Sequence, residues 1–239
     1  MLKTLAFAML LLVMTVPVSA GFKEGWTAYE RGDYWAAFRE FKPLAEQGHA
    51  NAQSYLGFMY YAHGQGVPNN YAEAVKWWRK AALQGNPIAQ YNLGLMYGAG
   101  LGVSKDYDEA FRWYRRAALQ GDAKAQYELG VMWANGHGVP KDYGVAIWWY
   151  RKAAQHGNAK AQYNLGALYG AGLGINKDVR MAFKWYSLAV ANQNSRASKA
   201  LDRLITKMSA AEIARAKKLL KAAQTKRPGK ATAETLPAE

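Results

Sequence analysis

The side chains that could do chemistry in this chain of 239 residues are few and scattered. Its four histidines, two near turns and two in loops of a repeating pattern, occupy unrelated positions: His49, His63, His137 and His156. There is no cysteine, which excludes disulfides and thiolate metal sites. The His-Glu-x-x-His pattern of zinc enzymes, the Gly-x-Ser-x-Gly nucleophile elbow and the phosphate-binding Gly-x-x-x-x-Gly-Lys-Ser/Thr loop are also absent. We therefore predict no catalytic residues, no bound metal and no cofactor.

Aromatic rings and basic side chains are the remaining groups with binding chemistry. Seven Phe, nine Trp and sixteen Tyr could stack on a sugar, but most recur every 36 residues, which favours core packing. The net charge is +14, and residues 196–230 hold eleven Lys or Arg against Asp202 and Glu212. We interpret this C-terminal basic cluster first as a solvated helix face. The alternative is attraction to an anionic surface, such as phospholipid or lipopolysaccharide head groups, or to an acidic protein.

Residues 1–20, MLKTLAFAMLLLVMTVPVSA, have the features of a cleavable signal peptide. Lys3 precedes an apolar run from Leu5 to Val13, and small residues precede the expected cleavage after Ala20. The run is shorter than the roughly 20 residues that a membrane-spanning helix needs. We therefore expect a periplasmic or secreted protein that is not an integral membrane protein after cleavage. Export would also separate the chain from nucleic acid, which we do not expect as a partner.

The elements that must position any binding residues form a repeat. A Leu-Gly pair recurs in steps of 37, 36 and 36 residues, at Leu56-Gly57, Leu93-Gly94, Leu129-Gly130 and Leu165-Gly166. A tryptophan follows in steps of 36, at Trp77, Trp113, Trp149 and Trp185. A period of this length is typical of a solenoid, in which each supersecondary unit buries its apolar face against its neighbours.

Each unit is predicted to be two helices joined by a loop. A glycine suited to a left-handed backbone follows the last helix of the preceding unit, at Gly48, Gly85, Gly121 and Gly157. A side chain that can cap the second helix comes every 36 residues, at Asn70, Asp106, Asp142 and Asp178. Two of these caps have the spacing of a capping box, with Glu73 and Glu109.

The glycine of each Leu-Gly pair lies inside a predicted helix, where glycine costs roughly 1 kcal/mol relative to alanine. We explain it by close approach of the two helices of a unit, with the repeated tryptophans filling the remaining space. The predicted organisation is a signal peptide (1–20), an N-terminal capping helix pair (21–47), four repeats (48–84, 85–120, 121–156 and 157–192), a C-terminal capping helix pair (193–224) and a disordered tail (225–239). A capping box from Ser209 to Glu212 is expected to open the last helix.

The string A-x-A-Q-Y-N-L-G-x-x-Y-x-x-G-x-G-V-x-K-D-Y-x-x-A-x-x-W-Y-x-x-A-A-x-x-G, matched closely at 123–157 and 159–186, resembles the Sel1-like repeat, a relative of the tetratricopeptide repeat. The resemblance covers about residues 48–192. It implies an all-α fold: a right-handed superhelical solenoid of helix-turn-helix repeats whose first helices line a concave surface. It also implies an adaptor for a protein or peptide, and exported bacterial members look like envelope adaptors in signalling, polysaccharide secretion or host contact. Some cysteine-rich members are linked to penicillin binding or β-lactam hydrolysis, but this chain has no cysteine and no Ser-x-x-Lys motif.

By comparison with tetratricopeptide geometry, the partner-binding positions lie on the inner face of the first helices, on either side of Leu-Gly. They are Asn51, Ser54, Phe58 and Tyr61 in the first repeat, Ile88, Tyr91 and Leu95 in the second, Lys124, Tyr127 and Val131 in the third, and Lys160 and Tyr163 in the fourth. The apolar end of this groove grades into a basic end, which suits an extended segment with hydrophobic anchors and an acidic part.

The sequence thus predicts an exported, non-enzymatic scaffold that binds a protein or peptide in the concave groove of its repeats. Stacked helices would hold the groove side chains in place before the partner arrives, which reduces the ordering cost of binding. The alternative is a glycan or cell-wall binding module that uses exposed aromatics and the basic C-terminal surface.

Overall fold

A computed structural model describes residues 18–225 except 63 and 65, and this part of the chain contains twelve α-helices and no β-strand. The chain divides into two compact units, residues 1–86 and 87–239. The first unit contains α1 (Val18–Glu30), α2 (Tyr34–Glu46), α3 (Ala50–Tyr61) and α4 (Tyr71–Leu83). The second contains α5 (Pro87–Ala99), α6 (Tyr107–Leu119), α7 (Ala123–Asn135), α8 (Tyr143–Gln155), α9 (Ala159–Ala171), α10 (Val179–Ala191), α11 (Ser195–Ile205) and α12 (Ala210–Thr225).

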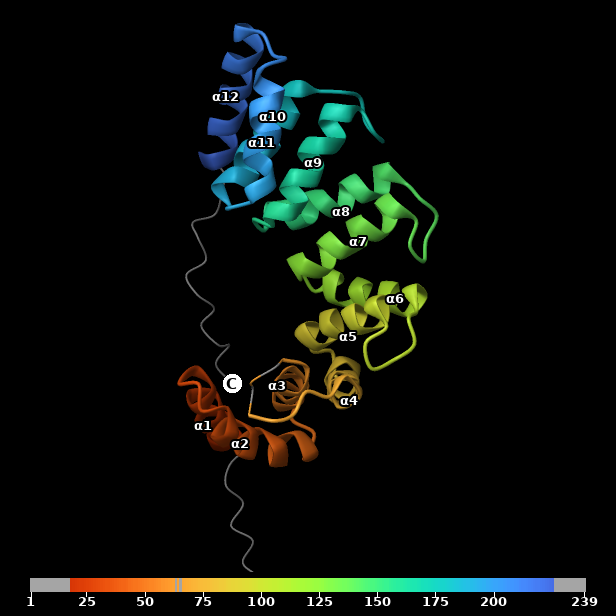
Figure 1. The fold of residues 1–239 in the computed structure, drawn as a ribbon, viewed down its shortest axis with the longest axis vertical. Coiled ribbons are helices and arrows are strands. Elements are labelled where there is room, and N and C mark those ends of the chain that lie inside the picture. Colours follow the sequence, from red (N-terminus) through yellow and green to blue (C-terminus); the bar gives the residue numbers. More distant parts are fainter. Residues whose placement is uncertain (1–17, 63, 65, 226–239) are drawn as a thin grey trace, which may run out of the picture. The chain divides into compact units, whose positions relative to one another are not determined.

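Within each unit, helices up to α11 that follow one another in the chain pack side by side, and α12 packs, like α11, against α10 (Figure 1). The predicted all-α fold of helix-turn-helix repeats is therefore confirmed. The expected signal peptide lies outside the described residues apart from 18–20, which begin α1, and the expected tail lies outside them after Thr225.

The residue that caps the second helix of a repeat also fixes the loop before it. The side chains of Asn70, Asp106, Asp142 and Asp178 accept hydrogen bonds from the first turns of α4, α6, α8 and α10, as predicted. The backbone N–H groups of these four residues donate, at 2.8–3.0 Å, to the carbonyls of Tyr60, Tyr97, Trp133 and Tyr169 near the end of the first helix. Each cap therefore ties the two helices of its repeat together.

The capping boxes predicted for the first two repeats are wrong. The cap N–H groups of Asn70 and Asp106 are already bonded across the loop, so the glutamates have no donor to meet there. Glu73 instead accepts from Lys76, and Glu109 accepts from Arg112 and from the Trp113 indole. The box at Ser209 does form, since the Ser209 N–H donates to Glu212 Oε2 (2.8 Å) and the Glu212 N–H donates to Ser209 Oγ (3.3 Å).

The glycine of each Leu-Gly pair allows an aromatic ring of the second helix to lie on the backbone of the first. A Cβ atom placed on Gly94 would lie 2.7 Å from Tyr114 Cδ1, and one on Gly130 would lie 2.5 Å from Tyr150 Cδ1. Gly57 meets Trp78 and Gly166 meets Tyr186 in the same way. The close approach of the helices is confirmed, and the ring responsible is the one directly after the repeated tryptophan.

The repeated tryptophans fill a different space from the one predicted. Trp77 packs in a cluster with residues of α2 and α3, and Trp149 packs with residues of α6 and α7. Trp185 likewise packs against α8 and α9. These side chains therefore seal a repeat against the second helix of the preceding repeat, while the neighbouring ring seals the two helices within it.

A buried glutamine links successive repeats. The Nε2 groups of Gln53, Gln126 and Gln162 donate to carbonyls of the preceding second helix at 2.9, 3.1 and 3.1 Å. The Oε1 atoms of Gln53, Gln90 and Gln162 accept from Gln84, Gln120 and Asn192 at 2.7, 2.8 and 2.7 Å. In the third repeat the donor position is His156, and the buried Gln126 Oε1 has no hydrogen-bond partner among the described residues.

The two glycines of α5 test the close approach directly. Gly94→Ala should lower the free energy of unfolding by about 1–3 kcal/mol, because the added methyl overpacks against the buried Tyr114 ring. Gly98→Ala in the same helix is the matched control, since its Cβ would lie 3.7 Å from Ala110 Cβ, an ordinary contact. It should stabilise by up to ~1 kcal/mol through helix propensity alone. Urea unfolding of both variants measures the difference, and equal stability would contradict the packing argument.

A second prediction concerns Gln126 Oε1, which lacks a hydrogen-bond donor among the described residues. His156→Gln should supply the donor that Gln84 and Gln120 supply elsewhere and stabilise by about 0.5–1.5 kcal/mol. That gain corresponds to a rise in Tm of roughly 2–4 °C per kcal/mol for a chain of this size. The reverse change, Gln120→His, should lower the Tm. Calorimetry that finds no gain from His156→Gln would show that Gln126 is satisfied in another way.

Candidate partner-binding surface

The candidate surface of the first unit is the face of α3. Asn51 is exposed, Phe58 is 37% exposed and Tyr61 is half-buried, as a contact surface requires. The Tyr61 ring rests on the rings of Tyr71 and Trp78, with centroids 5.7 and 5.5 Å apart. These three predicted positions are therefore available to a partner.

Ser54 is not available, which corrects the predicted set. Its side chain is 5% exposed, and its carbonyl accepts from the Trp78 indole N–H at 3.0 Å. The other repeats have a tyrosine at this position and a tyrosine in place of Trp78. A small side chain on the first helix thus accommodates a larger ring from the second helix, and Ser54 is buried in that contact.

In the second unit the predicted residues form one row along α5, α7 and α9. Tyr91, Tyr127 and Tyr163 are half-buried, and each ring packs on a tyrosine ring of its own second helix with centroids 5.8, 5.9 and 5.6 Å apart. The ammonium of Lys124 lies 5.9 Å from the Tyr91 centroid, and that of Lys160 lies 5.9 Å from the Tyr127 centroid. Each lysine is therefore held over the tyrosine of the preceding repeat, a cation–π arrangement.

Apolar side chains flank this row. Ile88 is 54% exposed, and Leu95 and Val131 are half-buried. The structure thus brings Ile88, Tyr91, Leu95, Lys124, Tyr127, Val131, Lys160 and Tyr163 onto the first helices of one compact unit.

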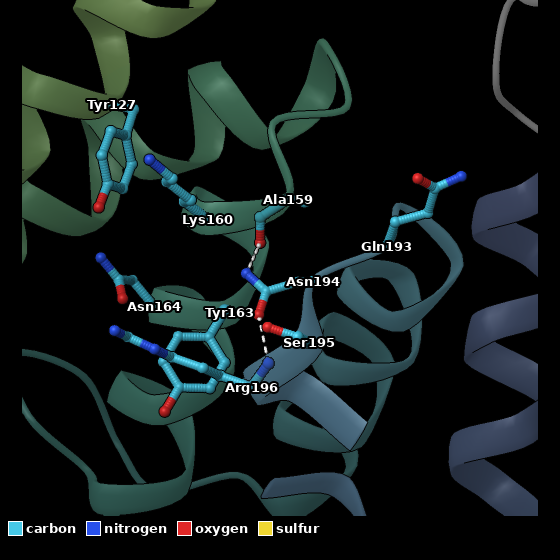
Figure 2. Close-up of a pocket in the computed structure, with 9 residues that line it drawn as sticks. All are labelled: Tyr127, Ala159, Lys160, Tyr163, Asn164, Gln193, Asn194, Ser195 and Arg196. Atoms are coloured by element: carbon cyan, nitrogen blue, oxygen red, sulfur yellow. Dashed lines mark hydrogen bonds between the residues drawn. The ribbon is translucent and has the colours of Figure 1, made fainter. Parts of the chain in front are cut away.

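Arg196 extends the basic row and was missed by the sequence analysis. It follows Lys160 by 36 residues and is exposed on α11, but the groove was predicted only within the four full repeats. A hollow of about 490 Å³ contains Tyr127, Lys160, Tyr163, Asn164 and Arg196 in its lining. Figure 2 shows the side chain of Arg196 across the Tyr163 ring in this view, with Asn164 directly above them and Lys160 next to Tyr127.

The backbone of this hollow is fixed by Asn194. Its Nδ2 donates to the Ala159 carbonyl at 3.1 Å, and its Oδ1 accepts from the Arg196 N–H at 3.1 Å, as the dashed lines of Figure 2 show. The start of α11, which carries Arg196, is therefore tied to the start of α9, which carries Lys160.

Buried polar groups lie beneath the row. Burial raises the pKa of Tyr114 and Tyr150, and it raises that of Tyr186 to about 12, so these phenols stay neutral at physiological pH. The Asn164 side chain acts on the hydroxyls of both Tyr127 and Tyr150 and partly opposes the rise in their pKa. Burial also raises the pKa of the Glu128 carboxyl, and Lys160 opposes that shift.

Glu128 and Asn164 were missed although the sequence contained a signal for them. They occupy the position directly before Leu-Gly, where the second, third and fourth repeats have Asn92, Glu128 and Asn164. The change of residue type at Glu128 marks the third repeat as different from its neighbours.

The histidines have separate local roles. His49 caps α3, since its Nδ1 accepts from the Ala52 N–H at 3.2 Å, and the His137 ring stacks on Tyr107 with centroids 4.7 Å apart. His156 is exposed at the end of α8, and His63 lies outside the described residues. Within residues 18–225, apart from 63 and 65, no three His, Asp or Glu side chains gather as a metal site would require. The helices of that same part are each too short or too polar to span a bilayer.

The C-terminal basic cluster is partly on α12. Arg215, Lys217, Lys218 and Lys221 are exposed there, while Ala216 packs into a cluster with Phe183 and Met208. The arrangement is that of a helix with one covered face and one solvated, basic face.

Comparison with known proteins identifies what the chain is similar to. The sequence pattern of the Sel1 repeat matches residues 50–86, 87–122, 123–158 and 159–194. The crystal structure of c5321, a protective antigen of uropathogenic Escherichia coli strains displaying an SLR fold, is 38% identical with a TM-score of 0.73. That match covers 77% of this chain and 40% of the other.

A Sel1 repeat protein from Oxalobacter formigenes is 40% identical with a TM-score of 0.72, and the match covers 76% of this chain and 74% of the other. A putative Sel1 repeat protein from Klebsiella pneumoniae is 21% identical, with a TM-score of 0.52 over 78% of this chain and 92% of that one. This third likeness concerns the fold alone.

The raised pKa of Glu128 predicts a pH-dependent stability. An ionised carboxylate that burial disfavours costs stability at neutral pH, so Glu128→Gln should raise the free energy of unfolding at pH 7.5. As the pH falls through the raised pKa towards the ordinary value of 4.5, the wild-type carboxyl takes up its proton and the advantage of the variant should shrink.

Urea unfolding between pH 4 and 8 measures this difference. Lys160 acts on Glu128 as well, and the phenols of Tyr114, Tyr127 and Tyr150 near it are kept neutral across that range by burial. Glu128 and His137 both line a second, smaller hollow of about 290 Å³, so the comparison is repeated in a His137→Asn background. A difference that does not change with pH would assign the effect to packing and not to charge.

Proposed function

The chain belongs to the Sel1 repeat family, and from this premise we propose that it is an exported, non-enzymatic scaffold that binds a protein or peptide on the first-helix face of its repeats. Sel1 and related tetratricopeptide-like repeats generally mediate protein–protein interaction and are generally non-catalytic. The partner, the compartment and the residues that bind are the parts that we propose.

The observation that carries the proposal is the row of basic groups on the second unit. Lys124, Lys160 and Arg196 are exposed at intervals of 36 residues. The two lysines lie over tyrosine rings of the first helices, and each of these rings is held in place by a tyrosine ring of the second helix. Side chains that are already positioned lose little entropy when a ligand binds. The row suits an extended segment that carries carboxylates at repeated intervals.

Apolar contacts complete the proposed surface. In the second unit Ile88, Leu95 and Val131 offer anchoring sites next to the basic row, and in the first unit Phe58 and Tyr61 offer the same on α3. We propose a partner segment with hydrophobic anchors and acidic residues, in keeping with the gradient in the sequence.

Export is supported by the sequence of residues 1–20 and by one relative. These residues have the charge, apolar run and small terminal residues of a signal peptide. The E. coli relative is described as a protective antigen, which supports a role at the cell envelope or in host contact for this chain as well.

A glycan-binding module is the second candidate, and exposed tryptophans favour it. Trp35 is 57% exposed and Trp148 is 50% exposed, and a lysine lies over the Trp148 ring at 5.3 Å from its centroid. Rings of this kind can stack on sugars. Retention on peptidoglycan beads that is lost in Trp148→Ala, but kept when the basic row is reversed, would favour this candidate over the scaffold.

The scaffold proposal is tested by peptide selection. A library of random linear peptides is selected on the purified protein, and the Kd of enriched peptides is measured by calorimetry. We expect acidic and hydrophobic enrichment, and we expect the double variant Lys160→Glu/Arg196→Glu to weaken binding at least tenfold, about 1.4 kcal/mol. Binding should also weaken as salt is raised.

The matched control reverses two exposed basic residues on second helices, Arg115→Glu/Lys152→Glu, with the same change in net charge. It should change Kd less than twofold. Failure to enrich any peptide, or equal binding by the two double variants, would sink the proposal for this surface.

A further inference from the structure

Three hollows of the second unit stand at equivalent positions of successive repeats. Their volumes are about 290, 370 and 460 Å³. Each contains in its lining the second-helix tyrosine that lies on the glycine of Leu-Gly, at Tyr114, Tyr150 and Tyr186. Each also contains a residue of the following first helix, and that residue differs: Glu128, Asn164 and Ala200. The repeat thus builds one hollow three times, and only the first of the three has a carboxylate in its lining.

The first of these, which we call the Glu128 hollow, holds a carboxylate without a counter-ion. Glu128 is half-buried, and its carboxylate makes no ion pair within 4.0 Å to any described cationic group. The positive charge of Lys160 in the next repeat attracts the Glu128 carboxylate, but the Lys160 ammonium lies over the Tyr127 ring. A partly desolvated carboxylate of this kind gains much from a cation that comes within contact.

The walls of the Glu128 hollow suit the stem and head of a basic side chain. Tyr107 and His137 stack on each other at one side, and the Tyr114 ring lies on the second helix. Leu95 and Val131 supply apolar surface. Aromatic faces attract a cation, and apolar walls cover the methylene stem of lysine or arginine.

The size of the hollow fits one side chain. Its volume of about 290 Å³ lies at the lower limit of the roughly 300–1,000 Å³ of small-molecule sites. A single lysine or arginine inserted from a bound segment would occupy it without the rest of the segment having to enter.

We propose that the Glu128 hollow takes a lysine or arginine side chain of the partner, with Glu128 as its counter-ion. The inference rests on the proposed function, because the cation comes from the same segment that the basic row binds. The partner segment therefore carries both signs of charge: a basic residue for Glu128 and acidic residues for Lys160 and Arg196. Register is set by this one carboxylate, since Asn164 and Ala200 stand at the equivalent positions of the other hollows.

The test uses small probes, so that it does not depend on finding a peptide. Amide resonances of the ¹⁵N-labelled full chain are followed during titration with N-acetyl-lysine methylamide and with its uncharged analogue N-acetyl-norleucine methylamide. We expect the lysine probe to shift the amides of Leu95, Val131 and His137, and the norleucine probe to bind at least tenfold more weakly. Equal binding of the two probes would overturn the proposal.

Three variants assign the binding. Glu128→Gln should weaken the lysine probe at least tenfold, and Asp202→Asn, which removes an exposed carboxylate on α11, should leave it unchanged. Asn164→Asp should create a second response, at Ala134 and Leu173 in the next hollow, because it adds a carboxylate at the equivalent position. The gain in Asn164→Asp decides the matter even if Glu128→Gln disturbs the fold. Unchanged binding in Glu128→Gln together with no gain in Asn164→Asp would refute the assignment.

The two experiments fail separately. If peptides are selected through the basic row but the lysine probe does not bind, the scaffold proposal stands and the cation site is wrong. If the lysine probe binds in the Glu128 hollow but no peptide is enriched, the hollow is a cation site and the scaffold proposal is wrong.

Discussion

The structure depends on one contact that is repeated four times, an aromatic ring of the second helix resting on a glycine of the first. Because Gly94, Gly130 and Gly166 have no side chain, Tyr114, Tyr150 and Tyr186 lie directly on the first-helix backbone. Each of these rings then supports the tyrosine of the first helix in the same repeat. Two of those tyrosines in turn have a lysine of the following repeat over them. The candidate binding surface is therefore a continuation of the packing contact, and a change at the glycine would move the surface as well as loosen the core.

Most of the fold could be predicted from the sequence because its determinants are local and recur. Glycines with positive φ at Gly48, Gly85, Gly121 and Gly157 end one repeat, and Asp or Asn caps begin the second helix, as predicted. The capping boxes failed for a reason that no local pattern contains. The cap N–H of Asn70 or Asp106 donates across the loop to a carbonyl of the first helix, a bond that exists only once the two helices have packed.

The candidate site was predictable to a smaller degree, because exposure at one position depends on the size of a residue elsewhere. Ser54 occupies the position that Tyr91 has in the second repeat. In the first repeat the second helix carries Trp78 where the other repeats have a tyrosine, and Ser54 is buried. Arg196 lies on α11, which was predicted to belong to the C-terminal capping pair and not to the groove. Its spacing from Lys160 is nevertheless the 36 residues of the repeat. Glu128 lies directly before Leu-Gly, a position outside the groove set that tetratricopeptide geometry indicates.

Differences between repeats can have opposite meanings, and burial distinguishes them. His156 replaces a donor in the glutamine network and leaves Gln126 Oε1 without a partner among the described residues, and that unpaired oxygen lies inside the core. Glu128 also replaces a residue that is neutral in its neighbours, and burial raises its pKa at a cost to stability, yet its side chain lines a hollow open to solvent. A stability cost at a position that a ligand can reach is what a binding site entails, since the group that is poorly solvated in the free protein is the one that gains most when a counter-ion arrives. By that criterion Glu128 in the third repeat is the position where we propose that this array departs from its neighbours in order to select a partner.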